Sequence, residues 1–235
     1  MQQQNRRISA AEQIKHLILS RGLRPGDAIP TEPELCAELG VSRSSVREAI
    51  RALATLDIVE VRRGLGTVVG QMSLDPLVQT LVFRGVLSPG DDLAVLREVV
   101  EMRSALDIAL GEAVLEAHRG RADRSLDDLV AQMVASAAKG ETFLAADRQF
   151  HTELLAPVRN RLAGQLVAAF WDIHTAVLPG LDLALPADLR QTAKAHGDLL
   201  DAARAGDEAA YRRAVIEHYQ PLMRMLSDQA PRRRG

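Results

Sequence analysis

The sequence predicts a mainly α-helical protein with two domains, the second of which contains helices only. Aromatic residues make up only 3% of the 235 residues, which disfavours an all-β fold. Helix caps and apolar residues at helical spacing recur along the chain. Charge is also uneven: the first 70 residues hold ten Lys/Arg and eight Asp/Glu, and the rest hold nineteen and twenty-three. A weakly basic N-terminal domain joined to an acidic C-terminal one fits this distribution.

The first domain, residues 1–72, combines three short helices with a β-hairpin. Ser9 and Glu12 form a capping box, and Thr31 with Glu34 forms a second one. Gly40 is a good C-terminal stop for the helix that the second box begins. The predicted elements are helices from Ser9 to about 21, over 32–39 and over 43–55, and strands over 57–61 and 67–69. The order helix, helix, tight turn, helix, hairpin is that of a winged helix-turn-helix.

The second domain, residues 73–229, shows helical patterns separated by proline and glycine. We expect helices near 74–84, 91–118, 122–138, 141–156, 160–178, 186–205 and 207–228. Their apolar stripes should be buried in a bundle. The tail 230–235 is expected to be disordered.

Composition excludes several classes of protein. The single cysteine, Cys36, leaves no internal disulfide framework and no Cys-rich zinc site. No apolar run approaches the roughly 18 residues that span a bilayer, and residues 1–7 lack an apolar secretory core. We therefore expect a cytoplasmic protein without a membrane partner. Because the net charge is −2, any contact with nucleic acid must come from a local patch.

The start of the third helix and the hairpin turn suit contact with double-stranded DNA. A recognition helix enters the major groove with its N-terminal end. Arg43 and Arg47 share one helix face there, and short hydroxyl groups such as that of Ser42 can reach phosphates or base edges. The turn offers Arg62 and Arg63 beside glycines that let the backbone approach a groove wall. The alternative is that these arginines are ordinary surface residues.

The same segments resemble the GntR family of bacterial transcription regulators. The similarity covers nearly all of residues 9–70 and is carried by Gly22-Leu-Arg-Pro-Gly-Asp-Ala-Ile-Pro-Thr-Glu32, Glu34-Leu35, Leu39-Gly-Val-Ser-Arg43, Val46-Arg-Glu-Ala49 and Gly64-Leu-Gly-Thr-Val68. It implies a homodimer that binds a pseudo-palindromic operator. It assigns base and phosphate contacts to Arg43, Ser44, Ser45, Arg47, Arg63 and Gly64. Pro33 stands where some relatives carry a DNA-contacting arginine, so operator preference is expected to differ.

Four polar residues fall on apolar stripes of the second domain. Asp147 and His151 are four residues apart on one helix face, and His196 and His218 lie on the stripes of two later helices. Buried without partners, these groups would be costly. One Asp and three His can bind a divalent metal and leave positions open for water or a ligand. For each residue alone, a hydrogen-bonded core side chain is the alternative.

The pattern Asp147-x-x-Phe150-His151, the segment from His196 to Asp207, and His218 resemble the FCD domain of FadR-type regulators. The resemblance implies that Asp147, His151, His196 and His218 bind a divalent metal, zinc first, with nickel or manganese as alternatives.

Arg103 is the predicted contact for an organic-acid effector. Glu101-Met-Arg103 resembles the opening motif of the FCD domain, whose arginine commonly contacts such an acid. An ion pair with Asp107 is the alternative role for Arg103, and Asp107 departs from the more usual Glu. His174 is either a second effector contact or a packed core histidine, and Asn160 is expected to be a helix cap.

The predicted function is a transcription regulator that is not an enzyme. We expect a repressor whose operator affinity is controlled by a sugar acid or hydroxy acid bound near the metal. One alternative is a DNA-binding protein with a structural metal and a different signal. The other is a metal-dependent hydrolase, for which the sequence offers no separate general base.

Overall fold

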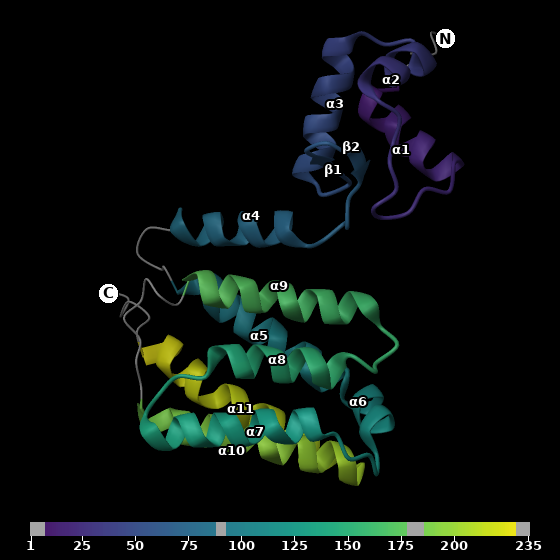
Figure 1. The fold of residues 1–235 in the computed structure, drawn as a ribbon. Helices are drawn as coiled ribbons and strands as arrows, with labels where there is room; N and C mark the ends of the chain where they lie inside the picture. Colours follow the sequence, from purple (N-terminus) through teal and green to yellow (C-terminus); the bar gives the residue numbers. More distant parts are fainter. Residues whose placement is uncertain (1–7, 88–92, 178–185, 229–235) are drawn as a thin grey trace, which may run out of the picture. The chain divides into compact units, whose positions relative to one another are not determined.

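A computed structural model of the chain describes residues 8–87, 93–177 and 186–228 and has two compact units, Met1–Pro76 and Leu77–Gly235. Figure 1 labels the elements of each unit. The described residues form helices and one two-stranded sheet, which confirms the predicted fold class. None of the helices within these ranges is long and apolar enough to cross a membrane. The predicted tail, 230–235, lies outside the described residues.

The first unit is a winged helix-turn-helix. Its elements are α1 (Ala10–Ser20), α2 (Glu32–Leu39), α3 (Arg43–Thr55), β1 (Val59–Arg62) and β2 (Gly66–Val69). The two strands pair antiparallel, with Val59 opposite Val69 and Arg62 opposite Gly66. Ile14, Leu35 and Val46, one from each helix, are fully buried at the centre of the core.

Local capping sets the helix ends of this unit. The Ser9 side chain accepts a hydrogen bond from the backbone of Glu12, and the Thr31–Glu34 capping box forms as predicted. The first strand begins two residues later than predicted. Asp57 has a φ of 54°, and its backbone N–H donates to Ala54, so residues 57 and 58 still belong to the turn that ends α3.

The second unit is a helical bundle. Helix α4 (Asp75–Val86) begins two residues before this unit, and the helices that follow are α5 (Ala94–Ala109), α6 (Gly111–His118), α7 (Arg124–Lys139), α8 (Leu144–Leu155), α9 (Arg161–Val177), α10 (Pro186–Ala205) and α11 (Glu208–Asp228). Helix α8 packs between α7 and α9, and α10 packs against α7 and α11 (Figure 1). Phe150, Trp171 and Leu199 are among the fully buried side chains of this core.

The prediction of one helix over 91–118 is wrong, because the helix is interrupted at Leu110, which separates α5 from α6. Gly111 starts α6 close against Tyr211 of α11. A Cβ atom at Gly111 would lie 3.2 Å from two carbons of the tyrosine ring. The break therefore accompanies a tertiary contact between residues 100 positions apart in the sequence.

Gly70 supports a test of the packing in the first unit. A Cβ atom there would overlap the backbone carbonyl of Asp57, which cannot move without breaking its bond from Met72. We expect Gly70→Ala to lower the free energy of unfolding of this unit by about 1–3 kcal/mol. Urea unfolding followed by circular dichroism measures the change. Gly164→Ala in α9 is the control. Open space surrounds that position, so the change should raise the free energy of unfolding of the second unit by about 0.5–1 kcal/mol. Equal stability of Gly70→Ala and the unmodified protein would contradict the packing described.

Candidate functional site

The residues predicted to contact DNA lie on the solvent-facing start of α3 and on the β1–β2 turn. Arg43, Ser44 and Arg47 are exposed, and so are Arg63 and Gly64 of the turn. Of the remaining two, Ser42 caps the helix and Ser45 lies in its first turn. The Ser42 hydroxyl oxygen accepts a hydrogen bond from the Ser45 backbone and lies 2.8 and 2.9 Å from the hydroxyl oxygens of Ser44 and Ser45.

The arginines of this surface differ in their pairing. The Nε group of Arg47 donates to Glu32 of α2 at 2.9 Å, and this contact raises the pKa of the guanidinium. Arg62 donates from two nitrogens to Glu60 on the same strand. Arg43 and Arg63, by contrast, have no ion-pair partner among the described residues. The sequence does not predict the contact of Glu32 with Arg47, because the position of Glu32 at the start of α2 does not reveal where its carboxylate points.

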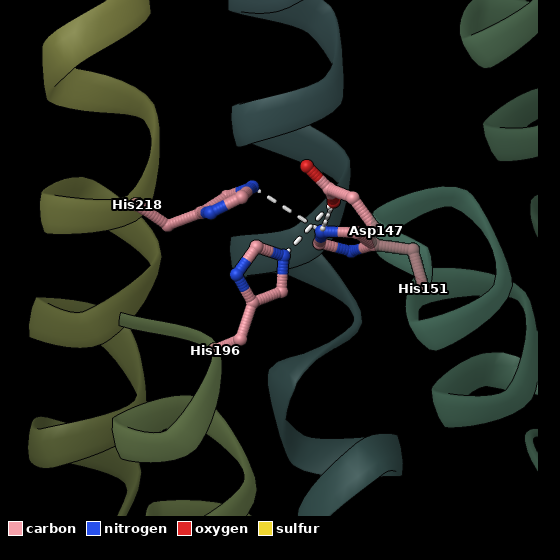
Figure 2. Close-up of side chains that lie close together, drawn as sticks. All are labelled: Asp147, His151, His196 and His218. Carbon is pink, nitrogen blue, oxygen red and sulfur yellow. Dashed lines mark hydrogen bonds and ion pairs between the residues drawn. The ribbon is translucent and has the colours of Figure 1, made fainter. Parts of the chain in front are cut away.

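In the second unit, the four predicted metal ligands come together. Asp147 and His151 project from α8, His196 from α10 and His218 from α11, and all four point to one centre (Figure 2). Asp147 Oδ1 lies 2.9 Å from His196 Nε2 and 3.4 Å from His151 Nε2. The Nε2 atoms of His151 and His218 are 3.2 Å apart. One potential ligand atom from each residue lies within 4.8 Å of the other three.

This cluster is buried and strongly coupled. None of the four residues is more than 7% exposed. Burial by itself raises the pKa of the Asp147 carboxyl, but the charge of His196 and hydrogen bonds from His151 and His196 hold that pKa well below its usual range. Burial, together with the charges of His196 and His151, lowers the pKa of His218 well below its ordinary value. These directions favour a carboxylate at Asp147 and a neutral imidazole at His218, the forms that bind metals.

The donor set suits a divalent cation. The Nδ1 group of His196 donates to the Thr192 carbonyl at 2.8 Å, which leaves Nε2 as the atom that faces the centre. Such a bond fixes the orientation of a metal-binding imidazole. The buried Nδ1 atom of His218 has no hydrogen-bond partner among the described residues. Three imidazole nitrogens and one carboxylate oxygen that converge in a buried space are the ligands that Zn²⁺ and similar ions accept.

A second layer of polar residues surrounds the cluster. Asp107 of α5 accepts a hydrogen bond from the Tyr219 hydroxyl at 2.7 Å, and its Oδ2 atom lies 3.7 Å from His151 Nδ1. The Arg103 side chain is 2% exposed, and its guanidinium carbon lies 4.0 Å from the centre of the Trp171 ring and 5.3 Å from that of Tyr219. The sequence analysis missed Tyr219 and Trp171 as neighbours of this site, since both fall on apolar stripes like any core aromatic residue.

Other histidines and the predicted cap lie elsewhere. The side chain of His174 is outside the part of the chain that the structure describes. His118 is buried but bonds to the Leu154 carbonyl at 2.8 Å, away from the cluster. The predicted cap is confirmed at Asn160, whose side chain accepts a hydrogen bond from the Ala163 backbone at the start of α9.

Two family profiles match the chain. The profile described as "Bacterial regulatory proteins, gntR family" covers residues 7–69, and the profile described as "FCD domain" covers residues 98–221. The first spans the helix-turn-helix and its wing. The second contains Arg103 and all four residues of the buried cluster.

Similar proteins are regulators of transcription and not enzymes. The "Galactonate operon transcriptional repressor" of Escherichia coli (strain K12) is 27% identical over 204 residues, 87% of this chain and 89% of that protein. The "HTH-type transcriptional regulator LutR" of Bacillus subtilis (strain 168) is 26% identical over 90% of this chain and 96% of its own length. A solved structure, "Streptococcus agalactiae GntR", is 29% identical with a TM-score of 0.65, covering 92% of this chain and 98% of that one.

Metal content tests the geometry of the cluster. We expect the protein purified with zinc to carry close to one ion per chain, and His151→Ala to lower zinc affinity by roughly a hundredfold or more, since outer-shell partners alone cost ten- to a hundredfold. Elemental analysis and competition with a chromophoric chelator give occupancy and affinity. His118→Ala removes a buried histidine outside the cluster and should retain the metal. Unchanged zinc affinity in His151→Ala would show that the ion binds elsewhere.

Proposed function

Because the chain belongs to the GntR family of bacterial regulatory proteins and carries an FCD domain, and is therefore a DNA-binding transcription regulator, we propose that a small hydroxy acid or sugar acid controls its operator affinity. The observation that carries the proposal is the buried cluster of Asp147, His151, His196 and His218 beside the buried Arg103. An ion in this cluster would supply positive charge for the carboxylate and hydroxyl oxygens of the effector.

Arg103 is suited to hold the carboxylate of such an acid. A guanidinium binds a carboxylate through two parallel hydrogen bonds. Trp171 lies under this guanidinium, and its ring centre is 6.1 Å from that of His151, so the arginine and the cluster share an aromatic neighbour. We infer that one ligand of a few carbon atoms contacts both. The relative named for a galactonate operon supports this class, since galactonate is a carboxylate with several hydroxyl groups.

We propose that the operator is read by the start of α3 and by the wing. A homodimer would present two such heads to a pseudo-palindromic site, in which the spacing of the half-sites mirrors the protein's two-fold symmetry. The effector acts as a switch only if its affinity differs between the DNA-binding pose and another pose of the heads. In a repressor, the effector favours the pose that binds DNA less well.

A structural metal with another signal is the second candidate, and burial favours it. Asp147 and the three histidines are shielded on all sides by the bundle, as in a closed structural site. In that case the ion would stabilise the fold, and no small acid would release the operator.

The DNA contacts can be tested by substitution. Replacing Arg43 and Arg47 together by Ala should abolish binding to the duplex that the protein enriches from a random pool, since each bidentate base contact is worth about 1–3 kcal/mol. Fluorescence anisotropy measures the affinity, and zinc content and oligomeric state should not change. Arg124→Ala is the control for loss of positive charge, because the side chain of Arg124 on α7 is exposed to solvent. Unchanged affinity of the double variant would refute the assigned helix.

The effector can be sought by thermal shift against sugar acids and small hydroxy acids. A ligand at a hundredfold excess over its Kd stabilises the native state by about 2.7 kcal/mol. We expect one acid to raise the Tm of the zinc-loaded protein and to change the fluorescence of Trp171, the single tryptophan. Arg103→Lys should lose this shift, and Arg148→Lys, on the exposed face of α8, should retain it. If removal of zinc lowers the Tm while no acid shifts it, the structural metal is the better account.

A further inference from the structure

Glu32 occupies a rigid position at the start of α2. Thr31 before it and Glu34 after it form the capping box, in which Glu34 accepts hydrogen bonds of 2.7 Å from both the backbone and the hydroxyl of Thr31. Pro33 fixes the backbone between them. The carboxylate of Glu32 is therefore displayed from a well-defined point, and it reaches across to the recognition helix.

The contact between Glu32 and Arg47 engages one edge of the guanidinium only. Glu32 Oε2 accepts from Arg47 Nε at 2.9 Å, and neither terminal nitrogen of Arg47 donates to another described residue. The Arg47 side chain is still 60% exposed. Its two terminal Nη groups thus form a free pair of donors that faces solvent from α3.

Two parallel donors are what recognition of a guanine requires. An arginine reads guanine by donating to its O6 and N7 acceptors in the major groove. A long side chain with an unrestrained guanidinium must give up rotamer freedom to make both bonds. With Nε already bound to the carboxylate of Glu32, whose backbone the capping box holds, the guanidinium of Arg47 samples fewer orientations before DNA arrives.

We propose that Glu32 is a positioning residue that orients the terminal edge of Arg47 and so determines how strictly one base pair of each operator half-site is read. The inference rests on the proposed DNA-reading role of α3. It also assigns a use to a negative charge that otherwise opposes DNA binding. Glu32 lowers the attraction between Arg47 and any phosphate. This weakens binding to unrelated DNA and so increases discrimination between DNA sequences further.

A purely structural ion pair between α2 and α3 makes a different prediction. Exposed pairs contribute little to stability, and loss of such a pair would change the affinities for all DNA sequences alike. A positioning role instead predicts changes of opposite sign: weaker binding to the selected duplex, and unchanged or tighter binding to unrelated DNA.

The experiment uses the full-length protein and a duplex that the unmodified protein enriches from a random-sequence pool. The Kd is measured by anisotropy for this duplex and for a scrambled duplex of equal length, at one salt concentration. Glu32→Gln should lower the ratio of the Kd for the scrambled duplex to the Kd for the selected duplex by about tenfold. Every single-base variant of the selected duplex is then measured, and the loss of discrimination should be confined to one base pair in each half-site. Glu38→Gln, which removes a charge from the same helix and breaks the pair with Arg21, should keep the ratio.

A double-mutant cycle separates orientation from charge. Lysine has no Nε–H donor in a planar fork, so in an Arg47→Lys background Glu32→Gln should retain only the smaller effect on the ratio that the change of charge produces. An unchanged ratio in Glu32→Gln, or the same loss in both backgrounds, would overturn the inference while DNA binding by α3 stands. If the unmodified protein enriches no duplex at all, the proposed function fails and the inference fails with it.

Discussion

The second unit is organised by the need to satisfy one carboxylate and three imidazoles inside an apolar bundle. An unpartnered buried charge is far more costly than any single packing contact. Asp147 and the three histidines avoid this cost by facing one another from α8, α10 and α11. Those helices can therefore pack only in a register that keeps the four side chains together, and apolar residues such as Phe150 fill the space around them.

The polar network extends beyond the cluster and connects it to α5. Asp107 and Arg103 lie one turn apart on α5, and Tyr219 on α11 contacts both of them. Burial raises the pKa of Tyr219 well above its ordinary value, so its hydroxyl stays protonated and donates to Asp107. A ligand carboxylate bound to Arg103 would therefore lie close to Asp107 and Tyr219. Asp107 lies beside His151, and the Tyr219 ring contacts that of His218. A small acid could thereby influence the positions of α5 and α11 together.

Sequence reasoning succeeded where the determinants are local. The Thr31–Glu34 capping box and Gly40 predicted α2 with the ends that the structure shows, and helical spacing placed Asp147 and His151 on one buried face. It failed where a distant residue decides. The break at Leu110 accompanies the approach of Gly111 to Tyr211, which no local pattern encodes. That His196 and His218 meet the other two was implied by family resemblance, because their periodicity shows burial but not the partner.

The two units use charge in opposite ways. Inside the bundle, burial strengthens electrostatic interactions, so a change of one group is felt by all of its neighbours. On α3 and the wing, solvent screens each ion pair, and one pair acts almost independently of the next. Arg43 and Arg63, without ion-pair partners among the described residues, retain their full attraction for phosphates, whereas Glu32 and Glu60 offset that of Arg47 and Arg62. Arg43 and Arg63 can then supply the attraction to any DNA, while Arg47 supplies the discrimination among sequences. A substitution can therefore change one of these properties without loss of the other.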